Sequence, residues 1–378
     1  MEKLEKIVMI GPVYPYRGGI SHYTGFLSKA LRKKYTVDMI SYKMQYPKFL
    51  FKAEQKDYAN DSFAVPDTEY LLHTANPFNI IKVGLEIRKR KPDLVIFQWW
   101  HPYFTPCLWI LQRALGKKIK TLFLCHNVFP HERFPMDHLL TRLALSKANY
   151  YVVQSKKDEA DLKSIKPSAK VRVTHHPIYD GFRLREMSRQ EARSVLGIPE
   201  EEHIVLFFGF VREYKGLKHL LDAVPYIGED VGRLKIWVVG SFGEDRELYL
   251  EQIDKLKIAD RVKLVEGYIP DQEIEKYFAA CDIVALPYES ATQSGIVQMA
   301  YGFRRPVIVT NVGGLPEVVD AGVTGYVTEP QNPQAIADAI IRYFTMDDPS
   351  VFEANVRNAE KKFSWDHLVR VIEELFNG

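Results

Sequence analysis

The chain has 378 residues, which is too long for one compact core and indicates two domains of ordinary size. Its 46% hydrophobic and 26% charged residues are typical of a globular protein, and a formal net charge of only +3 gives no reason to expect nucleic acid as a partner. The three cysteines are far apart in the sequence, which argues against a disulfide framework or a zinc site and fits a reducing compartment.

The N-terminus runs from Met1–Lys6 into a short apolar segment and lacks the apolar region of a signal peptide. No uninterrupted apolar run reaches the roughly 18 residues that a membrane span needs. We therefore expect a cytoplasmic protein.

The first half of the chain alternates apolar strands with amphipathic helices, as a doubly wound parallel sheet does. Residues 42–76 are less regular and read as a long loop with short elements. The strands are expected at 6–10, 36–40, 92–97, 120–124, 150–153 and 170–173, and the helices at 20–34, 77–91, 102–116 and 135–148.

Turn residues at 175–181 interrupt the alternation, which then starts again as a second Rossmann-like half. Since sites in open α/β sheets lie outside the carboxyl ends of the strands, we expect two such domains facing a central cleft. The domains are placed at 1–180 and 181–362, followed by a helix at 363–378. The strands of the second half are expected at 203–208, 235–239, 261–265, 282–286 and 306–309.

A segment between Pro287 and Gly302 has the pattern of a strand end, a loop of small residues and a helix start. Thr292 lies in the loop, and Ser294 and Gly295 open a helix with apolar positions at helical spacing. The unpaired N–H groups of such a first turn can bind a phosphate without a metal ion. The other interpretation is an ordinary turn between a strand and a helix.

Two further strand ends could bind the same anion. Arg212 and Lys215 follow the first strand of the second half, where two cations can neutralise a diphosphate; such residues are more often simply solvated. Gly18 and Gly19 follow the first strand of the chain and would let the backbone approach an anion closely, or would only form a tight turn. Neither segment matches the GxGxxG or GxxxxGK[ST] pattern.

Histidines follow two adjacent expected strands. His101 follows the first of these strands, His126 follows the second, and His131 lies just beyond His126. A histidine in this place can bind a ligand hydroxyl or transfer a proton, although any single one is more often structural. Their spacing is not that of a helical HExxH metal site.

Taken together in this order, these patterns resemble the group 1 (family 4) retaining glycosyltransferases, which have the GT-B fold. The resemblance covers both halves of the chain. It rests on Gly18–Gly19, His126–Asn127, Arg212 with Lys215–Gly216, Val239–Ser241, Glu266–Ile269, Gln298 with Gly302 and Pro306–Ile308, and Gly313–Glu317.

The resemblance implies that the C-terminal domain binds a nucleotide-sugar donor and the N-terminal domain binds the acceptor, with the last helix crossing back to the N-terminal domain. It implies no metal and no other cofactor. The implied roles are donor diphosphate binding by Gly18, Gly19, Arg212, Lys215, Thr292, Ser294 and Gly295, nucleoside binding by Gly240, Tyr268, Ile269 and Gln298, and a catalytic position beside the sugar for His126.

The chain departs from the family at two glutamates that usually face the sugar and the ribose. Ala291 and Gln298 stand at these positions, and Glu289 is two residues out of register. Gln298 can still hydrogen-bond a ribose hydroxyl, but Ala291 cannot replace a carboxylate. We therefore assign Glu289 to the catalytic position and expect an intact diphosphate site beside an unusual sugar site.

The predicted function is a retaining, metal-independent transfer of a sugar to a glycan or lipid-linked glycan. The alternatives are a nucleotide-sugar epimerase of the same fold and a donor-binding relative without transferase activity. The aromatic and lysine-rich segment Tyr42–Tyr58 suggests contact with the inner face of an anionic membrane, or is a solvated loop.

Overall fold

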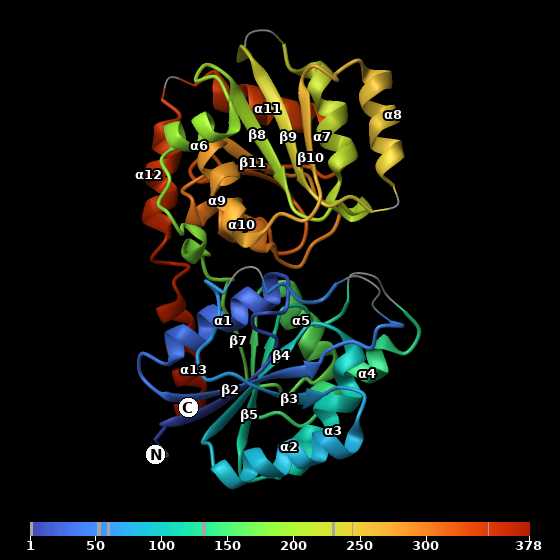
Figure 1. Ribbon diagram of the computed structural model, residues 1–378, viewed down its shortest axis with the longest axis vertical. Coiled ribbons are helices and arrows are strands. Elements are labelled where there is room, and N and C mark those ends of the chain that lie inside the picture. The colour runs from blue at the N-terminus through green and yellow to red at the C-terminus, as the bar shows by residue number, and fades with distance from the viewer. Residues whose placement is uncertain are drawn as a thin grey trace. The chain divides into compact units, whose positions relative to one another are not determined.

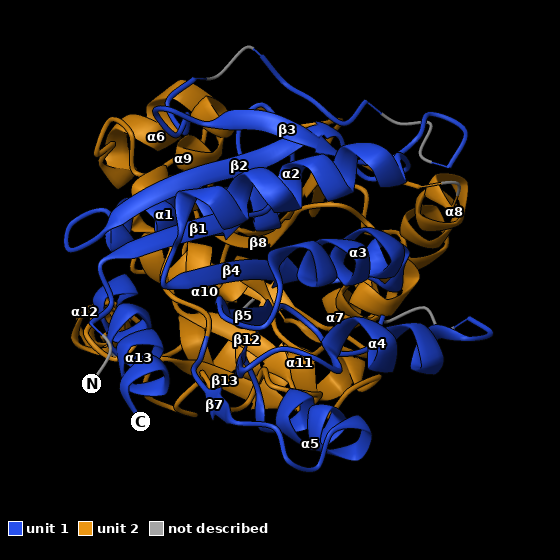
Figure 2. Ribbon diagram, turned by 90° about the horizontal axis from the view of Figure 1, so that it is seen from below, with its two compact units in different colours: residues 1–175, 364–378 blue, residues 176–363 orange. Residues whose placement is uncertain are grey.

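The computed structural model describes residues 3–50, 54–58, 61–130, 134–228, 231–243, 245–346 and 348–378. The chain forms two compact units, which Figures 1 and 2 show. Unit 1 comprises residues 1–175 and 364–378, and unit 2 comprises residues 176–363. Each unit has its own parallel sheet with helices on both faces, which confirms the predicted fold class of two Rossmann-like α/β domains.

The sheet of unit 1 has seven parallel strands in the order β3-β2-β1-β4-β5-β6-β7. Its central strands are mostly apolar, because helices cover both faces of a parallel sheet. The strands are β1 Lys6–Ile10, β2 Thr36–Met44, β3 Glu69–His73, β4 Leu94–Trp99, β5 Lys120–Cys125, β6 Tyr150–Val153 and β7 Val171–Val173.

The helices of unit 1 include the last helix of the chain, α13, which packs against α1, β6 and β7. The Tyr35 hydroxyl donates to Glu373 at 2.6 Å, and the rings of Tyr23 and Trp365 meet edge to face. The helices are α1 Gly19–Leu31, α2 Pro77–Arg90, α3 Thr105–Leu115, α4 Asp137–Leu145, α5 Lys156–Ile165 and α13 Trp365–Asn377.

The sheet of unit 2 has six parallel strands in the order β10-β9-β8-β11-β12-β13. The strands are β8 His203–Phe208, β9 Leu234–Gly240, β10 Val262–Glu266, β11 Ile283–Leu286, β12 Val307–Thr310 and β13 Gly325–Thr328. The helices are α6 Arg189–Leu196, α7 Leu217–Ala223, α8 Arg246–Leu256, α9 Asp271–Ala280, α10 Gly295–Gly302, α11 Pro333–Phe344 and α12 Ser350–Ala359.

Residues 42–76, predicted as a long loop with short elements, contain the end of one strand and the whole of another. Strand β2 continues to Met44, and β3 forms the edge of the sheet inside that segment. Tyr42 is fully buried in β2, where its carbonyl accepts a hydrogen bond of 2.9 Å from the Tyr16 hydroxyl. The pattern of β3 is half polar because an edge strand is partly exposed, so it lacks the apolar run that identifies a central strand.

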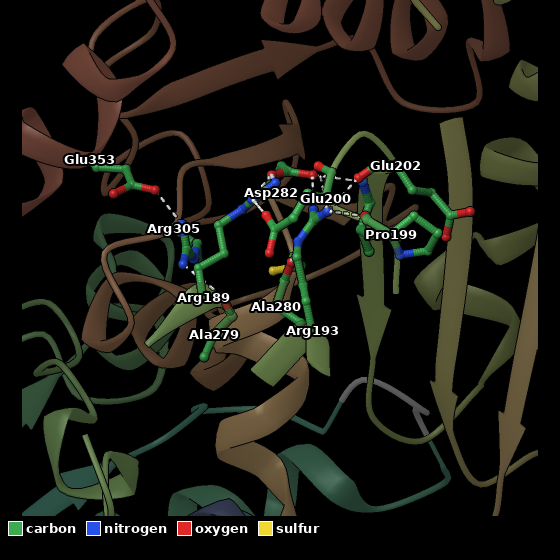
Figure 3. A network of polar contacts seen from close by, with 12 residues as sticks. Arg189, Arg193, Pro199, Glu200, Glu202, Ala279, Ala280, Asp282, Arg305 and Glu353 are labelled. Atoms are coloured by element: carbon green, nitrogen blue, oxygen red, sulfur yellow. Dashed lines mark hydrogen bonds and ion pairs between the residues drawn. The ribbon is translucent and has the colours of Figure 1, made fainter. Parts of the chain in front are cut away.

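A buried ion pair joins α6 to the start of β11 in unit 2 (Figure 3). Arg193 has no exposed surface and lies 3.0 Å from the carboxylate of Asp282, which also accepts from the backbone N–H of Ile204. The other guanidinium hydrogens of Arg193 go to the carbonyls of Pro199, Ala280 and Glu202, among others. This network fixes β8 and β11 side by side at their amino ends.

Candidate functional site

The strand order of unit 2 reverses between β8 and β11, which lie side by side with connections running in opposite directions. Ligands of open α/β sheets bind outside the carboxyl ends of the strands at such a point. The loops that follow these two strands touch. The N–H of Glu289 donates to the carbonyl of Tyr214 at 2.7 Å, and a Cβ on Gly216 would lie 2.0 Å from the carbonyl oxygen of Pro287.

The cations predicted from the sequence stand at this switch point. Lys215 is half-buried, and its ammonium lies 3.4 Å from the point that a Cβ on Gly209 would occupy; Ile296 of α10 lies 3.7 Å from the same point. Arg212 is exposed and stacks over the ring of Phe210 at 4.6 Å. Within the described residues neither cation forms an ion pair.

The electrostatics of the two cations favour an anion between them. Burial, together with the charge of Arg212, lowers the pKa of Lys215 to about 8. An anionic ligand would reverse this effect, because an opposite charge favours the protonated amine. Lys215 is therefore a charge that lacks a counterion in the part of the chain that the structure describes.

The first turn of α10 stands beside Lys215. Ser294 caps it, since its hydroxyl accepts from the N–H of Ile296 at 3.2 Å. Thr292 and Ser294 are buried, and the N–H of Gly314 donates to the carbonyl of Thr292 at 2.9 Å. The start of α10 at Gly295 thus places the positive end of a helix dipole on a braced loop near the two cations.

Glu289 is held by side chains that the sequence analysis missed. Its carboxylate accepts from Lys218 at 2.9 Å, from His219 at 2.8 Å and from Gln331 at 3.1 Å. Burial alone would raise the pKa of Glu289, but these hydrogen bonds outweigh it, so the pKa lies below its ordinary range. Lys218 and His219 follow Lys215 in the sequence, and their proximity to Glu289 depends on the contact between the two loops. The catalytic role of Glu289 stays a prediction.

Gln298 lies on α10 and is fully buried. Neither its amide nitrogen nor its amide oxygen has a hydrogen-bond partner among the described residues. Its backbone carbonyl accepts from the N–H of Tyr179 at 3.2 Å. A buried amide without partners is costly, and a ligand hydroxyl would satisfy it.

Gly240 is the last residue of β9, and Tyr268 and Ile269 follow β10. Gly240 has a backbone φ of 147°, and a Cβ there would lie 2.0 Å from the carbonyl oxygen of Gly209, so the packing of two strand ends requires glycine. The N–H of Gly267 donates to the carbonyl of Gly240 at 3.1 Å. Tyr268 is exposed and Ile269 is half-buried at the edge of the sheet, where both can contact a ligand.

In unit 1, Gly18 and Gly19 begin α1 at the corresponding switch point, between β1 and β4. Gly18 has a φ of 104°, which favours glycine. A Cβ at either glycine would have no described atom outside its neighbouring residues within 4 Å, so close packing with described residues does not require glycine at these two positions. The neighbouring Arg17 lies 3.6 Å from the carboxylate of Glu54.

His126 follows β5, and its Nε2 shares a hydrogen bond of 2.8 Å with the amide oxygen of Gln98. The ring of Tyr23 meets the imidazole edge to face at 4.7 Å. The sequence analysis missed Gln98, although a glutamine inside the apolar strand β4 is a signal for it. His101 instead accepts from the N–H of Tyr103 and caps a short 3-10 turn, and His131 lies outside the described residues.

Two kinds of feature are absent from the described residues. No group of three or more His, Cys, Asp and Glu side chains there is arranged to hold a metal ion. No helix in the same part of the chain is long and apolar enough to cross a membrane.

The fold and the switch-point site define a two-domain protein of the GT-B type, as solved structures show. The chain superimposes on Anabaena HepE in complex with UDP and glucose with a TM-score of 0.75 and 18% identity, covering 99% of each chain. It superimposes on sucrose-phosphate synthase of Thermosynechococcus elongatus with a TM-score of 0.72 and 20% identity, covering 99% of this chain and 98% of the other.

Two family models match the chain. The model of glycosyl transferases group 1 matches residues 188–363, and that of glycosyltransferase family 4 matches residues 17–180. The chain therefore belongs to the group 1 (family 4) glycosyltransferases.

Relatives in other organisms align with part of the chain. An uncharacterized glycosyltransferase of Methanocaldococcus jannaschii is 30% identical over 249 residues, which are 62% of this chain and 61% of the relative. D-inositol 3-phosphate glycosyltransferase of Corynebacterium urealyticum is 30% identical over 202 residues, 51% of this chain and 47% of the relative. The chain thus spans about half to three fifths of the length of these relatives.

Proposed function

We propose that this protein transfers a sugar from a nucleoside-diphosphate sugar to a glycan or a lipid-linked glycan, with retention of the anomeric configuration and without a metal ion. The observation that carries the proposal is the pair Arg212 and Lys215, two cations without counterions among the described residues at the switch point of unit 2. Two fixed cations and a helix N-terminus suit a diphosphate.

The chemistry follows from these charges. The bond between the sugar C1 and the diphosphate oxygen breaks, and the acceptor oxygen forms a bond to C1 on the same face of the sugar. The acceptor proton passes to the departing diphosphate. Charge builds up on the leaving oxygen in the transition state, where Arg212, Lys215 and the start of α10 would stabilise it; one such contact is typically worth on the order of 10²–10³ in rate.

The nucleoside half of the donor is assigned to the remaining residues of unit 2. The buried amide of Gln298 has no partner in the described structure and suits a ribose hydroxyl. Tyr268 and Ile269 offer exposed apolar surface to a nucleobase at the end of β10. We infer that UDP is the first nucleotide to test, because the similar Anabaena protein was solved with UDP.

The proposal is tested by binding and by turnover. UDP and a panel of nucleotide sugars should raise the unfolding temperature of the wild type, and the Lys215→Ala and Arg212→Ala variants should lose this stabilisation. Lys255→Ala, which removes an exposed lysine of α8, is the matched control and should leave it unchanged. Unchanged binding in the two site variants would remove the diphosphate assignment.

One observation favours a second candidate, a donor-binding relative without transferase activity. Glu289 is the residue nearest to the family's sugar-facing glutamate. Its carboxylate already accepts hydrogen bonds from Lys218, His219 and Gln331. Incubation with a bound nucleotide sugar and a set of acceptors distinguishes the candidates. Release of the nucleoside diphosphate with a glycosylated acceptor supports transfer, an epimerised free donor indicates the epimerase, and an intact donor supports a binding protein.

A further inference from the structure

A row of large apolar side chains lies exposed along α2 in unit 1. Phe78, Ile81 and Leu85 are exposed, and Phe78 keeps 85% of its surface. Their spacing of three and four residues places them on one side of the helix. The opposite side of α2 packs into the core through Ile80, Val83 and Ile87, so the row faces away from the sheet.

A second row with the same spacing lies on α4. Met136, Leu139 and Leu143 are exposed, and Leu139 keeps 63% of its surface. Helix α2 packs against α3, and α3 packs against α4, so the three helices form one layer on the sheet (Figure 2). Ala144 and Leu145 of α4 join the same core as the buried side of α2. Both rows therefore face outward from one layer, which we name the α2–α4 surface.

The part of the chain that forms this surface is strongly basic. Residues 77–149 contain twelve Lys and Arg but four Asp and Glu, a formal charge of +8 in a chain whose total is +3. The described cations of the surface make no ion pair with described residues; they are Lys82, Arg88, Lys89, Arg113, Lys117, Arg142 and Lys147.

The described acids of this part are not available to balance these charges. Glu86 pairs with Arg90 at 2.6 Å, Asp93 accepts from two backbone N–H groups near the N-terminus, and Asp137 is buried. The α2–α4 surface therefore combines exposed apolar rows with cations that form no ion pair with described residues.

A pocket lies at the carboxyl ends of α3 and α4 on this layer. It has a volume of about 610 Å³, and its lining includes Arg113, Lys117 and Lys147 but no carboxylate. Arg88 of α2 stands beside it, 3.6 Å from the point that a Cβ on Gly116 would occupy. Four cations around one hollow can hold a phosphate group.

We propose that the α2–α4 surface docks on an anionic lipid bilayer, with the two apolar rows in the headgroup region and the basic pocket on a lipid phosphate. Exposed apolar side chains between unpaired cations are the combination that a negatively charged membrane surface binds. A second copy of the chain fits less well, because two surfaces of the same strong positive charge repel each other. The inference does not depend on the proposed function, since it uses none of the donor-site residues.

The test is sedimentation of the full chain with lipid vesicles. The protein should bind vesicles that contain about one third phosphatidylglycerol and should leave pure phosphatidylcholine vesicles largely unbound. Phe78→Ser with Leu139→Ser should lower the partition coefficient by at least about tenfold. Each of Arg113→Ala and Lys147→Ala should lower it by about fivefold.

The control is Leu248→Ser on α8 of unit 2, where the leucine is 63% exposed, as Leu139 is. This variant should bind vesicles as the wild type does, and all variants should keep the wild-type unfolding temperature. Equal binding to vesicles with and without phosphatidylglycerol would overturn the proposal. An equal loss of vesicle binding in Leu248→Ser would overturn it as well. So would a wild-type dimer in solution that Phe78→Ser with Leu139→Ser dissociates, because the surface would then be a protein interface.

Discussion

The two units have the same type of sheet, yet they treat charge in different ways. Unit 2 pairs Arg193 with Asp282 in its interior and leaves Arg212 and Lys215 unpaired, among the described residues, where its strand order reverses. Unit 1 has the hydrogen-bonded pair His126 and Gln98 and two glycines at the equivalent strand ends, and Arg17 beside the glycine loop lies near Glu54. The fold thus supplies the place for a site, and the residues at the strand ends decide whether it suits an anion or hydroxyl groups.

The largest effect is expected from the buried charge of unit 2. Arg193→Met removes the fully buried partner of Asp282, which keeps only its partly exposed pair with Arg189, and it takes the donor from the carbonyls of Ala280 and Glu202. The free energy of unfolding should fall by about 3–5 kcal/mol. Urea denaturation followed by fluorescence measures it. Arg233→Met, which removes an exposed ion pair with Glu201, is the control and should cost less than about 1 kcal/mol. Equal losses in both variants would show that the interior pair has no special weight.

Substitutions at the His126 and Gln98 pair of unit 1 should lower turnover and leave nucleotide binding unchanged. His126→Ala is expected to lower kcat for sugar transfer by on the order of 10²-fold, because it removes a group able to hydrogen-bond a hydroxyl of the transferred sugar. The affinity for UDP should stay as in the wild type, since His126 is assigned to the transferred sugar and not to the diphosphate. Gln98→Leu should give a smaller loss through a misplaced imidazole. His101→Ala removes the cap of a 3-10 turn and a ring contact with Phe134, and it should keep kcat. Full activity of His126→Ala would make this residue structural.

The unpaired cation of unit 2 should make donor binding depend on pH. The pKa of Lys215 is lowered to about 8 from an ordinary value of 10.5, so between these pH values the unfolded chain holds a proton that the folded chain lacks. The contribution of this group to folding stability therefore rises with pH across the window.

Affinity for UDP should move in the opposite direction, because binding uses the charged amine. Calorimetric titration should show a loss of about tenfold between pH 7 and pH 9. Lys215→Met should bind weakly at both pH values and remove the difference. A wild-type affinity that is flat across this range, or a Lys215→Met variant that keeps the slope, would contradict the assignment.

The smallest effects are expected from replacing one buried glutamine in each unit, Gln298 in unit 2 and Gln112 in unit 1. Gln298→Leu removes an amide without partners and should leave the stability of the free protein unchanged or raise it by about 1 kcal/mol. The same change should weaken UDP binding by about fivefold, because a ribose hydroxyl loses its partner. Gln112→Leu in unit 1 is the counterpart. Its amide donates to the carbonyls of Leu108 and Ala144, so this variant should lose stability and keep UDP affinity.

Much of the fold could be predicted because it depends on local patterns. The central strands β1, β4, β5, β8 and β9 are buried on both faces and read as continuous apolar runs. The edge strands β3 and β13 were missed: β3 is partly exposed and mixes polar residues into its pattern, and β13 has only four residues, of which Gly325 and Thr328 are not apolar. The charged loop with Arg212 and Lys215 was located correctly at a strand end, because a glycine and a polar turn mark where an apolar run stops.

By itself, the sequence determined the elements, their alternation in two halves and the strand ends that carry chemical groups. These features follow from the spacing of apolar residues and turns, which is local information. Only the tertiary structure decided which charges have partners. Glu289 meets Lys218 and His219 through the contact of two loops about 70 residues apart, and His126 meets Gln98 across neighbouring strands. Whether a charged side chain is neutralised or exposed depends on which distant segments of the chain are in contact. The order of the strands in the sheet determines these contacts.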